Sequence, residues 1–240
     1  MASSFMDITI VFNKDEIRNK IESNQTGTIS TINANIMVNA YKNSAYKEIL
    51  NNNVFNICDG SLLVTIINLF NRTNFSSYPG PDFFMDRILE KKFKHVFIGA
   101  TREVLNGLQK ELVEIDSEIK NNLFYELPFK DVNEFNYAEI AKKINKEKPD
   151  FIWVSLGAPK QEVFAYNLHK YIDKGFLVSV GAAFDFYSGL GHVNRCPKVL
   201  REFKLEWLYR VIKQPSKTIK RLKVELFYMP IIIVKELFKK

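Results

Sequence analysis

Several polar residues that could act in catalysis lie directly after short apolar runs of the sequence. Asp59 follows the apolar run 54–57, where its carboxylate could act as a general base toward a hydroxyl group. It could instead cap the helix expected to follow, and the residues by themselves favour the cap. Thr31 and Asn33 lie at the end of another apolar run, and helix capping is again the simpler interpretation.

A second kind of motif is a turn whose backbone N–H groups could meet an anion. The segment GAPKQE at residues 157–162 follows an apolar run and opens a helical pattern, which favours contact with a phosphate or a sugar. It lacks the GxxxxGK[ST] spacing of a Walker A loop, so hydrolysis of a nucleoside triphosphate has no support. Gly189 and Gly191, with Asn194 at the third glycine's place, are a poor dinucleotide-binding signal.

Two further segments could also bind an anion. The turn at residues 78–82 contains two prolines and a glycine and leads into a helix whose N-terminus could face negative charge. Arg195 and Arg210 could clamp an anionic group with two hydrogen bonds each. The alternative is that they pair with Glu202 and Glu206 on a helix.

The sequence lacks the motifs of several kinds of catalytic and metal-binding site. The three histidines, His95, His169 and His192, are scattered and suggest neither a zinc site nor a Ser-His-Asp triad. No Asp-x-Asp pair is present to hold a divalent metal on a nucleotide sugar. Cys58 and Cys196 form no CxxC pair, which is typical of a reducing compartment.

The helices and strands expected to hold these residues in place alternate along the sequence. Such alternation is typical of α/β layering around a mostly parallel sheet, in which ligands bind at the carboxyl ends of the strands. Strands are predicted at residues 29–32, 54–57, 95–98, 151–156 and 176–180. Helices are predicted at residues 37–50, 61–71, 83–91, 101–112, 135–146 and 160–171.

Length and composition limit the class of protein. The 240 residues, 46% hydrophobic and 25% charged, predict an ordered globular chain with a single large core. The longest uncharged apolar run, residues 226–234, has nine residues, about half of the ~20 that a bilayer-spanning helix needs. The first ten residues lack the features of a secretory signal, so we expect a cytoplasmic protein.

The basic charge is concentrated in the last fifty residues. Residues 191–240 hold 13 Lys and Arg against four Asp and Glu, whereas residues 1–190 hold 21 against 23. Basic and apolar residues alternate at helical spacing from residue 207 onward. The pattern predicts an α/β body at 1–194 and, at 195–240, a basic amphipathic appendage that lies on an anionic membrane surface. The alternative is a terminal helix that packs its apolar face on the body.

In this order and spacing, the motifs resemble those of the WecG/TagA/CpsF glycosyltransferases, family 26 of the glycosyltransferase classification. The resemblance covers about residues 6–223. It rests on Thr31-Ile32-Asn33, Asp59-Gly60, Pro79-Gly80-Pro81-Asp82, the segments 157–162 and 180–186, Arg195-Cys196-Pro197, the segment 205–210 and Pro215.

The resemblance implies a fold and an activity. The fold is a Rossmann-like, mostly parallel α/β sheet with flanking helices, a GT-E-type body, followed by the helical appendage. The reaction moves N-acetylmannosamine, with inversion, from a UDP-sugar to polyprenyl-diphosphate-linked N-acetylglucosamine. It needs no metal ion or other cofactor, and it takes place at the inner face of the cytoplasmic membrane, in synthesis of a teichoic-acid-type or capsule-type polysaccharide.

The resemblance also implies roles for matching positions. Asp59 is the candidate catalytic base, with Thr31 and Asn33 beside it as contacts to the sugar or the acceptor. The candidate substrate-binding residues are Gly80, Asp82, Gly157, Pro159, Lys160, Gln161, Glu162, Asp185, Arg195, Arg210, Lys217 and Lys220. The last three would bring positive charge to the diphosphate.

Other functions compete with this interpretation. The same fold could use another UDP-hexose as donor. The α/β pattern with its broken glycine motif could belong to a nicotinamide-dependent oxidoreductase, and the basic tail could tether a non-catalytic nucleotide-binding module to a membrane. We expect a UDP-sugar, a polyprenyl-diphosphate acceptor and the membrane surface as partners, with self-association open and no nucleic acid bound.

Overall fold

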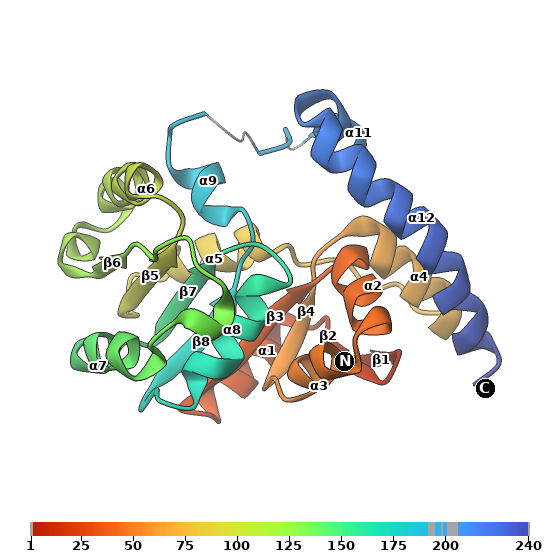
Figure 1. The fold of residues 1–240 in the computed structure, drawn as a ribbon, viewed down its shortest axis with the longest axis horizontal. Helices are drawn as coiled ribbons and strands as arrows, with labels where there is room; N and C mark the ends of the chain where they lie inside the picture. Colours follow the sequence, from red (N-terminus) through yellow and green to blue (C-terminus); the bar gives the residue numbers. More distant parts are fainter. Residues whose placement is uncertain (1, 192–194, 198, 201–205, 240) are drawn as a thin grey trace.

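The computed structural model describes residues 2–191, 195–197, 199–200 and 206–239. It contains an eight-stranded sheet with the strand order β1-β2-β4-β3-β8-β7-β5-β6 (Figure 1). All neighbouring strands are parallel except β1 and β2, so the predicted α/β class is confirmed. The strands are β1 (Ala2–Phe5), β2 (Ile8–Val11), β3 (Thr26–Ile32), β4 (Phe55–Cys58), β5 (His95–Gly99), β6 (Leu123–Tyr125), β7 (Phe151–Ser155) and β8 (Gly175–Ser179).

The sequence patterns predicted five of these strands and missed β1, β2 and β6. β1 and β2 form a hairpin whose two turn residues, Met6 and Asp7, have φ angles of 56° and 59°. Turns that need two positive φ angles usually carry Asn or Gly, so this hairpin lacks its usual signal. β6 has only three residues, too few for a recognisable alternation.

Helices flank the sheet on both faces. The α-helices in the described residues include α1 (Lys14–Glu22), α2 (Ala34–Lys42), α3 (Ser44–Asn51), α4 (Ser61–Asn71), α5 (Gly80–Leu89), α6 (Arg102–Ile115), α7 (Tyr137–Glu147), α8 (Lys160–His169), α9 (Ala183–Tyr187), α11 (Glu206–Lys213) and α12 (Pro215–Leu237). Two short 3-10 helices, η1 (Ser117–Asn121) and η2 (Val132–Glu134), lie in the connections around β6.

The single helix predicted at 37–50 is wrong, because α2 and α3 are separate helices that meet at Asn43. The backbone of Asn43 is extended, with φ −138°, and its side-chain oxygen accepts a hydrogen bond from the backbone N–H of Tyr46 at 3.1 Å. An Asn side chain that satisfies the first turn of a new helix competes with continuation of the preceding one. The break places Tyr46 in the first turn of α3.

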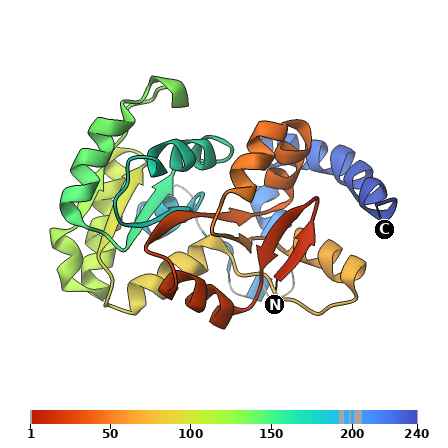
Figure 2. The same cartoon turned by 90° about the horizontal axis from the view of Figure 1, so that it is seen from below.

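Three groups of buried side chains form the core. α1, α5, α6 and α9 pack on one face of the sheet, against residues such as Ile29, Phe97 and Trp153. α7 and α8 cover the other face, against Ile98 and Ile152, and α2, α3 and α4 pack around β1 and β2. Figure 2 shows the sheet between these helical layers. The layers leave the ends of the strands as the place where polar residues can gather.

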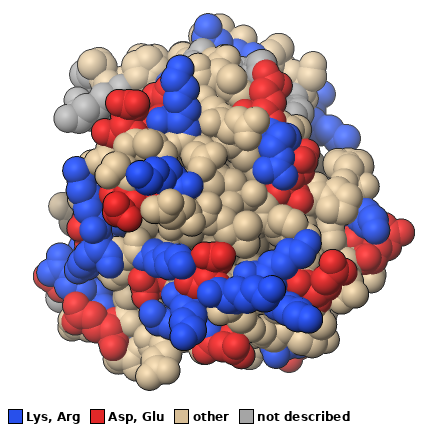
Figure 3. Space-filling model, turned by 90° about the vertical axis from the view of Figure 1, so that its left-hand side faces the viewer, with Lys and Arg blue, Asp and Glu red and all other residues tan. Residues whose placement is uncertain are grey.

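The surface around α6, α7 and β6 mixes both signs of charge. Figure 3 shows basic and acidic side chains interspersed on this side. Several form ion pairs, such as Lys94 with Glu147 at 2.9 Å and Arg102 with Glu126 at 3.3 Å. This side of the body therefore carries no extended field of one sign, in keeping with the near-neutral charge of residues 1–190.

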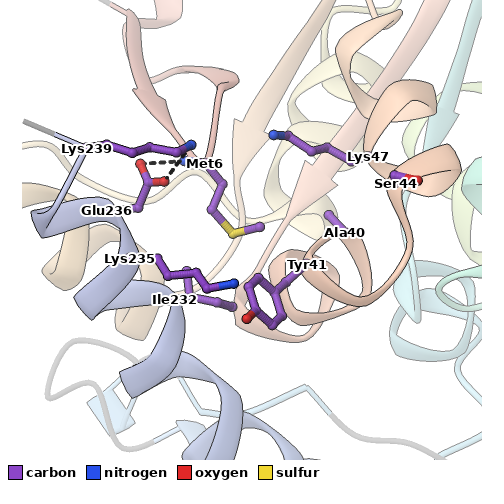
Figure 4. Close-up of a pocket in the computed structure, with 9 residues that line it drawn as sticks. All are labelled: Met6, Ala40, Tyr41, Ser44, Lys47, Ile232, Lys235, Glu236 and Lys239. Carbon is purple, nitrogen blue, oxygen red and sulfur yellow. Dashed lines mark hydrogen bonds and ion pairs between the residues drawn. The ribbon is translucent and has the colours of Figure 1, made fainter.

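α12 runs beside α2, and its C-terminal half is docked on the body (Figure 1). Met229 and Ile232 are buried in the cluster that contains α2 and α4 side chains. Glu236 accepts a hydrogen bond from the backbone N–H of Met6 at 3.1 Å, and Lys239 pairs with Asp7 at 2.9 Å. A cavity of about 190 Å³ remains here, shown in Figure 4 and lined by Met6, Ala40, Tyr41, Ser44, Lys47, Ile232, Lys235, Glu236 and Lys239.

The packing of α12 is relevant to the predicted division into an α/β body at 1–194 and an appendage at 195–240. The boundary at 194–195 borders residues 192–194, which lie outside the described part of the structure. One face of α12 packs on the body, as the alternative interpretation of the tail expected. None of the helices in the described residues has the length and apolar character needed to cross a bilayer.

His95 makes stability sensitive to mild acid. The ring is 1% exposed, its Nδ1 accepts a hydrogen bond from the Trp153 indole N–H at 3.1 Å, and burial lowers its pKa to about 4. Because the unfolded chain binds a proton near pH 6.5, His95 contributes stability above that pH, and the contribution is lost as the pH falls from 6.5 toward 4. Between pH 7.5 and 5, the free energy of unfolding should fall by about 2 kcal/mol from this group alone.

Urea unfolding of the wild type and of His95→Gln at these two pH values checks this prediction. The glutamine side chain keeps an acceptor for the Trp153 indole but does not titrate. The wild type should lose about 2 kcal/mol more than the variant on acidification. Equal losses in the two proteins would contradict the assignment.

Candidate functional site

Asp59 lies between the carboxyl ends of β3 and β4. Its backbone N–H donates to the carbonyl of Ile32, the last residue of β3, at 2.7 Å. The N-cap residue of α4 is Gly60, which makes no side-chain capping bond. The capping interpretation of Asp59 is therefore wrong, because the chain turns at Gly60 (φ 135°) before the helix begins. Burial and the neighbouring Asp59 carboxylate raise the pKa of the Cys58 thiol, so Cys58 remains a thiol at neutral pH.

Thr31 and Asn33 have different tasks at the end of β3. Asn33 is the N-cap of α2, and its side-chain oxygen accepts a hydrogen bond from the backbone N–H of Ile36 at 3.2 Å. The capping prediction is confirmed for Asn33. The Thr31 hydroxyl instead donates to the carbonyl of Ser179 at the end of β8, at 3.0 Å. Thr31 thereby joins the ends of β3 and β8.

The turn before α5 lies directly against Thr31. The Tyr78 backbone N–H donates to the carbonyl of Cys58 at 2.8 Å, which fixes the turn beside Asp59. A Cβ added to Gly80 would lie 2.9 Å from Oγ1 and 3.0 Å from Cγ2 of Thr31. The close approach explains why glycine is needed at this position, and it brings the predicted residues Gly80, Thr31 and Asp59 together.

Arg195 lies at the N-terminus of α5. It pairs with the carboxylate of Asp82 at 2.5 Å and donates to the hydroxyl of Tyr187 at 2.5 Å. Tyr187 in turn donates to the carbonyl of Pro81 at 3.2 Å. The charge of Arg195 is thus shared with Asp82 on α5. Asp185, also predicted at the site, lies on α9, two residues before Tyr187.

The segment after β7 divides into two parts. Gly157, with φ 75°, and Pro159 lie at the carboxyl edge, where the turn leads into α8. The ammonium of Lys160 donates to the carbonyl of Lys130 and lies over the rings of Phe129 and Phe135. Lys160 would have to leave these contacts to reach a phosphate group.

Gln161 and Glu162 are buried at the start of α8. Gln161 is 2% exposed: its Nε2 donates to Glu162 Oε1 at 2.7 Å and its Oε1 accepts from the backbone N–H of Gly181 at 3.1 Å. Glu162 is 1% exposed, and its other oxygen accepts from the Tyr46 hydroxyl at 2.9 Å. Burial raises the pKa of Glu162, and burial beside Glu162 raises the pKa of Tyr46. Both carboxyl oxygens of Glu162 thus face protein groups in the core, and its contact with a substrate stays a prediction.

The sequence model of the glycosyl transferase WecG/TagA/CpsF family matches residues 4–240. The chain belongs to this glycosyltransferase family. A relative from Bacillus subtilis, named N-acetylglucosaminyldiphosphoundecaprenol N-acetyl-beta-D-mannosaminyltransferase, is 32% identical over 190 residues, 78% of this chain and 72% of the relative. A Bacillus spizizenii protein of the same name is 28% identical over 200 residues, 82% of this chain and 75% of the relative.

The C-terminal residues predicted for this glycosyltransferase lie on α11 and α12. Lys220 is exposed on α12. Arg210 on α11 and Lys217 on α12 are placed by their backbone, and their side chains lie outside the described part of the structure. Within the described residues, no group of three or more His, Cys, Asp and Glu side chains is arranged to hold a metal ion. Metal independence of the transferase remains a prediction.

Sequence reasoning missed three tyrosines that hold residues in or beside the candidate site. Tyr46 holds Glu162, and Tyr187 joins Arg195 to the turn before α5. Tyr78 donates to Asp86 at 2.5 Å, and Asp86 also pairs with Lys14 on α1 at 2.9 Å. These partners lie in other elements, so no local motif marks them. The only sequence signal was the position of Tyr78 beside a recognised turn.

Gly80→Ala should impair the glycosyltransferase through Thr31. The new methyl group would overlap Thr31, whose movement breaks its hydrogen bond to Ser179. Overpacking of this kind costs about 1–3 kcal/mol of stability, and displacement at the reacting centre should lower the transfer rate about 10- to 100-fold. Initial rates and thermal unfolding of the purified variant measure the two effects.

A second substitution tests the steric cause. Thr31→Ser removes Cγ2 and keeps the hydroxyl, so adding it to Gly80→Ala should restore part of the stability and part of the rate. A Gly80→Ala enzyme with wild-type rate and stability would show that the contact with Thr31 is not needed.

Proposed function

We propose that this glycosyltransferase moves N-acetylmannosamine from a UDP-sugar to polyprenyl-diphosphate-linked N-acetylglucosamine. The observation that carries the proposal is the match to two relatives whose names state this sugar and an N-acetylglucosaminyldiphosphoundecaprenol acceptor, over more than 70% of their length. The site adds a carboxylate, Asp59, between the ends of β3 and β4, where α/β enzymes bind their ligands.

In the proposed reaction, Asp59 acts as the general base. Its carboxylate takes the proton of the acceptor hydroxyl, whose oxygen forms a bond to the anomeric carbon of the donor. The bond from that carbon to the UDP oxygen breaks as the new bond forms, and UDP leaves with the electron pair. Attack opposite the leaving group inverts the anomeric configuration.

The leaving diphosphate needs positive charge. Arg210, Lys217 and Lys220 lie on α11 and α12, in the basic part of the chain. Cationic side chains at a developing phosphate charge can stabilise it without a metal ion. We therefore propose a metal-independent reaction, with Arg210 binding the diphosphate through the two-pronged geometry that lysine lacks.

We also propose that α12 binds the cytoplasmic face of the membrane peripherally. Away from Met229 and Ile232, α12 and the residue that follows it expose apolar side chains, here named the outer stripe: Ile219, Leu226, Phe227, Ile231, Val234, Leu237 and Phe238. Phe227 is 65% and Phe238 is 88% exposed. A helix that is apolar on both sides needs a second apolar environment, which the lipid interface supplies.

The reaction itself tests the proposal. The enzyme is incubated with a set of UDP-sugars and short-chain polyprenyl-diphosphate N-acetylglucosamine in the presence of EDTA, and products are identified by mass spectrometry. We expect a disaccharide lipid from UDP-N-acetylmannosamine. A product formed only from another UDP-sugar would overturn the donor, and a requirement for added metal would overturn metal independence.

A further inference from the structure

Tyr46, Glu162 and Gln161 form a buried chain of hydrogen bonds that ends at the backbone of Gly181. Tyr46 lies on α3, and Glu162 and Gln161 lie in the first turn of α8. The three side chains are 4%, 1% and 2% exposed. These hydrogen bonds therefore link helix α3 to the carboxyl edge of the sheet, and all three side chains that form them are buried.

Gly181 connects this hydrogen-bond chain to the candidate site. The residue follows β8 with φ 60°, and its carbonyl accepts a hydrogen bond from the Ser155 hydroxyl at the end of β7, at 2.6 Å. Two residues earlier, the carbonyl of Ser179 holds the Thr31 hydroxyl at 3.0 Å. A shift of Gly181 would move the end of β8 and, with it, the anchor of Thr31.

Only one orientation of the Gln161 amide satisfies the donors and acceptors in this hydrogen-bond chain. If the Gln161 amide were flipped, its oxygen would face Glu162 Oε1 and its NH₂ group would face the N–H of Gly181, so both bonds would be lost. Glu162 therefore selects the orientation that holds Gly181. Its second oxygen is buried and needs the Tyr46 hydroxyl as a donor, because an unpaired buried acceptor is costly.

We propose that Tyr46 and Glu162 are positioning residues for glycosyl transfer, which act by orienting the Gln161 amide and thereby the Gly181 turn beside Thr31. The inference rests on the proposed function. In this proposal, Glu162 acts by orienting the Gln161 amide and not by contacting the substrate. It also gives α3, which carries no predicted site residue, a part in the reaction.

Three variants test the proposal by kinetics. Tyr46→Phe and Glu162→Met each break the chain, and each should lower kcat/KM for transfer about 10- to 100-fold. The double variant should be no worse than Glu162→Met, because both act through one path. Glu162→Gln can keep both bonds, with its oxygen toward Gln161 and its NH₂ group toward the Tyr46 oxygen, so it should stay within about threefold of the wild type.

Tyr137→Phe is the matched control. It also removes a tyrosine hydroxyl bond, from Tyr137 on α7 to the carbonyl of Val132 at 2.5 Å, and this bond is not part of the buried hydrogen-bond chain. The control should lose stability without losing kcat/KM. If Glu162→Gln were as impaired as Glu162→Met, or if the two single losses multiplied in the double variant, the proposed path would be overturned.

A second readout does not depend on turnover. Hydrogen exchange followed by mass spectrometry should be faster in the peptide containing Gly181 for Tyr46→Phe and Glu162→Met, and unchanged there for Tyr137→Phe. Unchanged exchange in all three variants would overturn the inference. Failure of the proposed function would show separately, as a wild-type enzyme that forms no disaccharide lipid.

Discussion

Asp59→Asn should lower the rate of glycosyl transfer about 10²- to 10⁴-fold, the range expected for loss of a general base. Asparagine has the shape of aspartate but cannot take the proton of the acceptor hydroxyl. The backbone bond from residue 59 to the Ile32 carbonyl does not depend on the side chain, so the turn after β4 should persist. Initial rates with UDP-N-acetylmannosamine measure the loss, and calorimetric titration with UDP should show binding within a few-fold of the wild type.

Asp150→Asn is the matched control for this prediction. Asp150 precedes β7 at the opposite edge of the sheet, where its carboxylate accepts from the Lys94 backbone N–H and pairs with Lys174, both at 2.8 Å. The control should keep the wild-type rate, because asparagine still accepts a hydrogen bond and the residue is remote from the site. Full activity of Asp59→Asn would refute the assignment of the base.

Serine substitutions in the outer stripe should weaken membrane binding about 10²- to 10⁴-fold. Phe227, Val234 and Phe238 are exposed, and removing three apolar side chains from a lipid interface costs about 1–2 kcal/mol each. The face of α12 that packs on α2 is unchanged, so the protein should remain folded. Co-sedimentation with phosphatidylglycerol-containing vesicles measures the loss.

The matched control places serine at exposed apolar residues on other faces of the molecule. Leu89 at the end of α5 and Tyr171 after α8 are 56% and 49% exposed. Their replacement should leave vesicle binding unchanged. The outer-stripe variant should also keep transfer to a short-chain, water-soluble acceptor while losing transfer to acceptor in vesicles. Equal vesicle binding by the two variants would show that the outer stripe does not meet the membrane.

Local sequence patterns located the five central strands, β3, β4, β5, β7 and β8, because each carries its own signal. β4, for example, is an apolar run that ends in Asp59 and Gly60, and β7 ends in the turn at residues 157–159. Because parallel strands share one carboxyl edge, the residues that follow them were expected to converge there. The hydrogen bonds of Asp59 to Ile32 and of Thr31 to Ser179 confirm that convergence.

Local patterns failed where hydrogen bonds and ion pairs with particular groups, distant or near in the sequence, decide the conformation. The turn at Met6 and Asp7 has no glycine or asparagine, and its partners are Glu236 and Lys239 near the C-terminus. The helical pattern at 37–50 gave no measure of how strongly Asn43 would cap α3. In both places, bonds to other groups outweigh the backbone preference of the residue itself.

Sequence patterns were enough to predict the α/β class, the edge at which the polar motifs meet, and membership of a glycosyltransferase family. The tertiary structure alone decided that Glu162 is buried against Tyr46, that Gly80 contacts Thr31, and that α12 has one packed and one exposed apolar face. The reason for this difference is how far apart in the sequence the interacting residues lie. Periodicity and turn chemistry act between near neighbours in the chain, whereas burial and hydrogen-bond partners depend on which distant segments pack together.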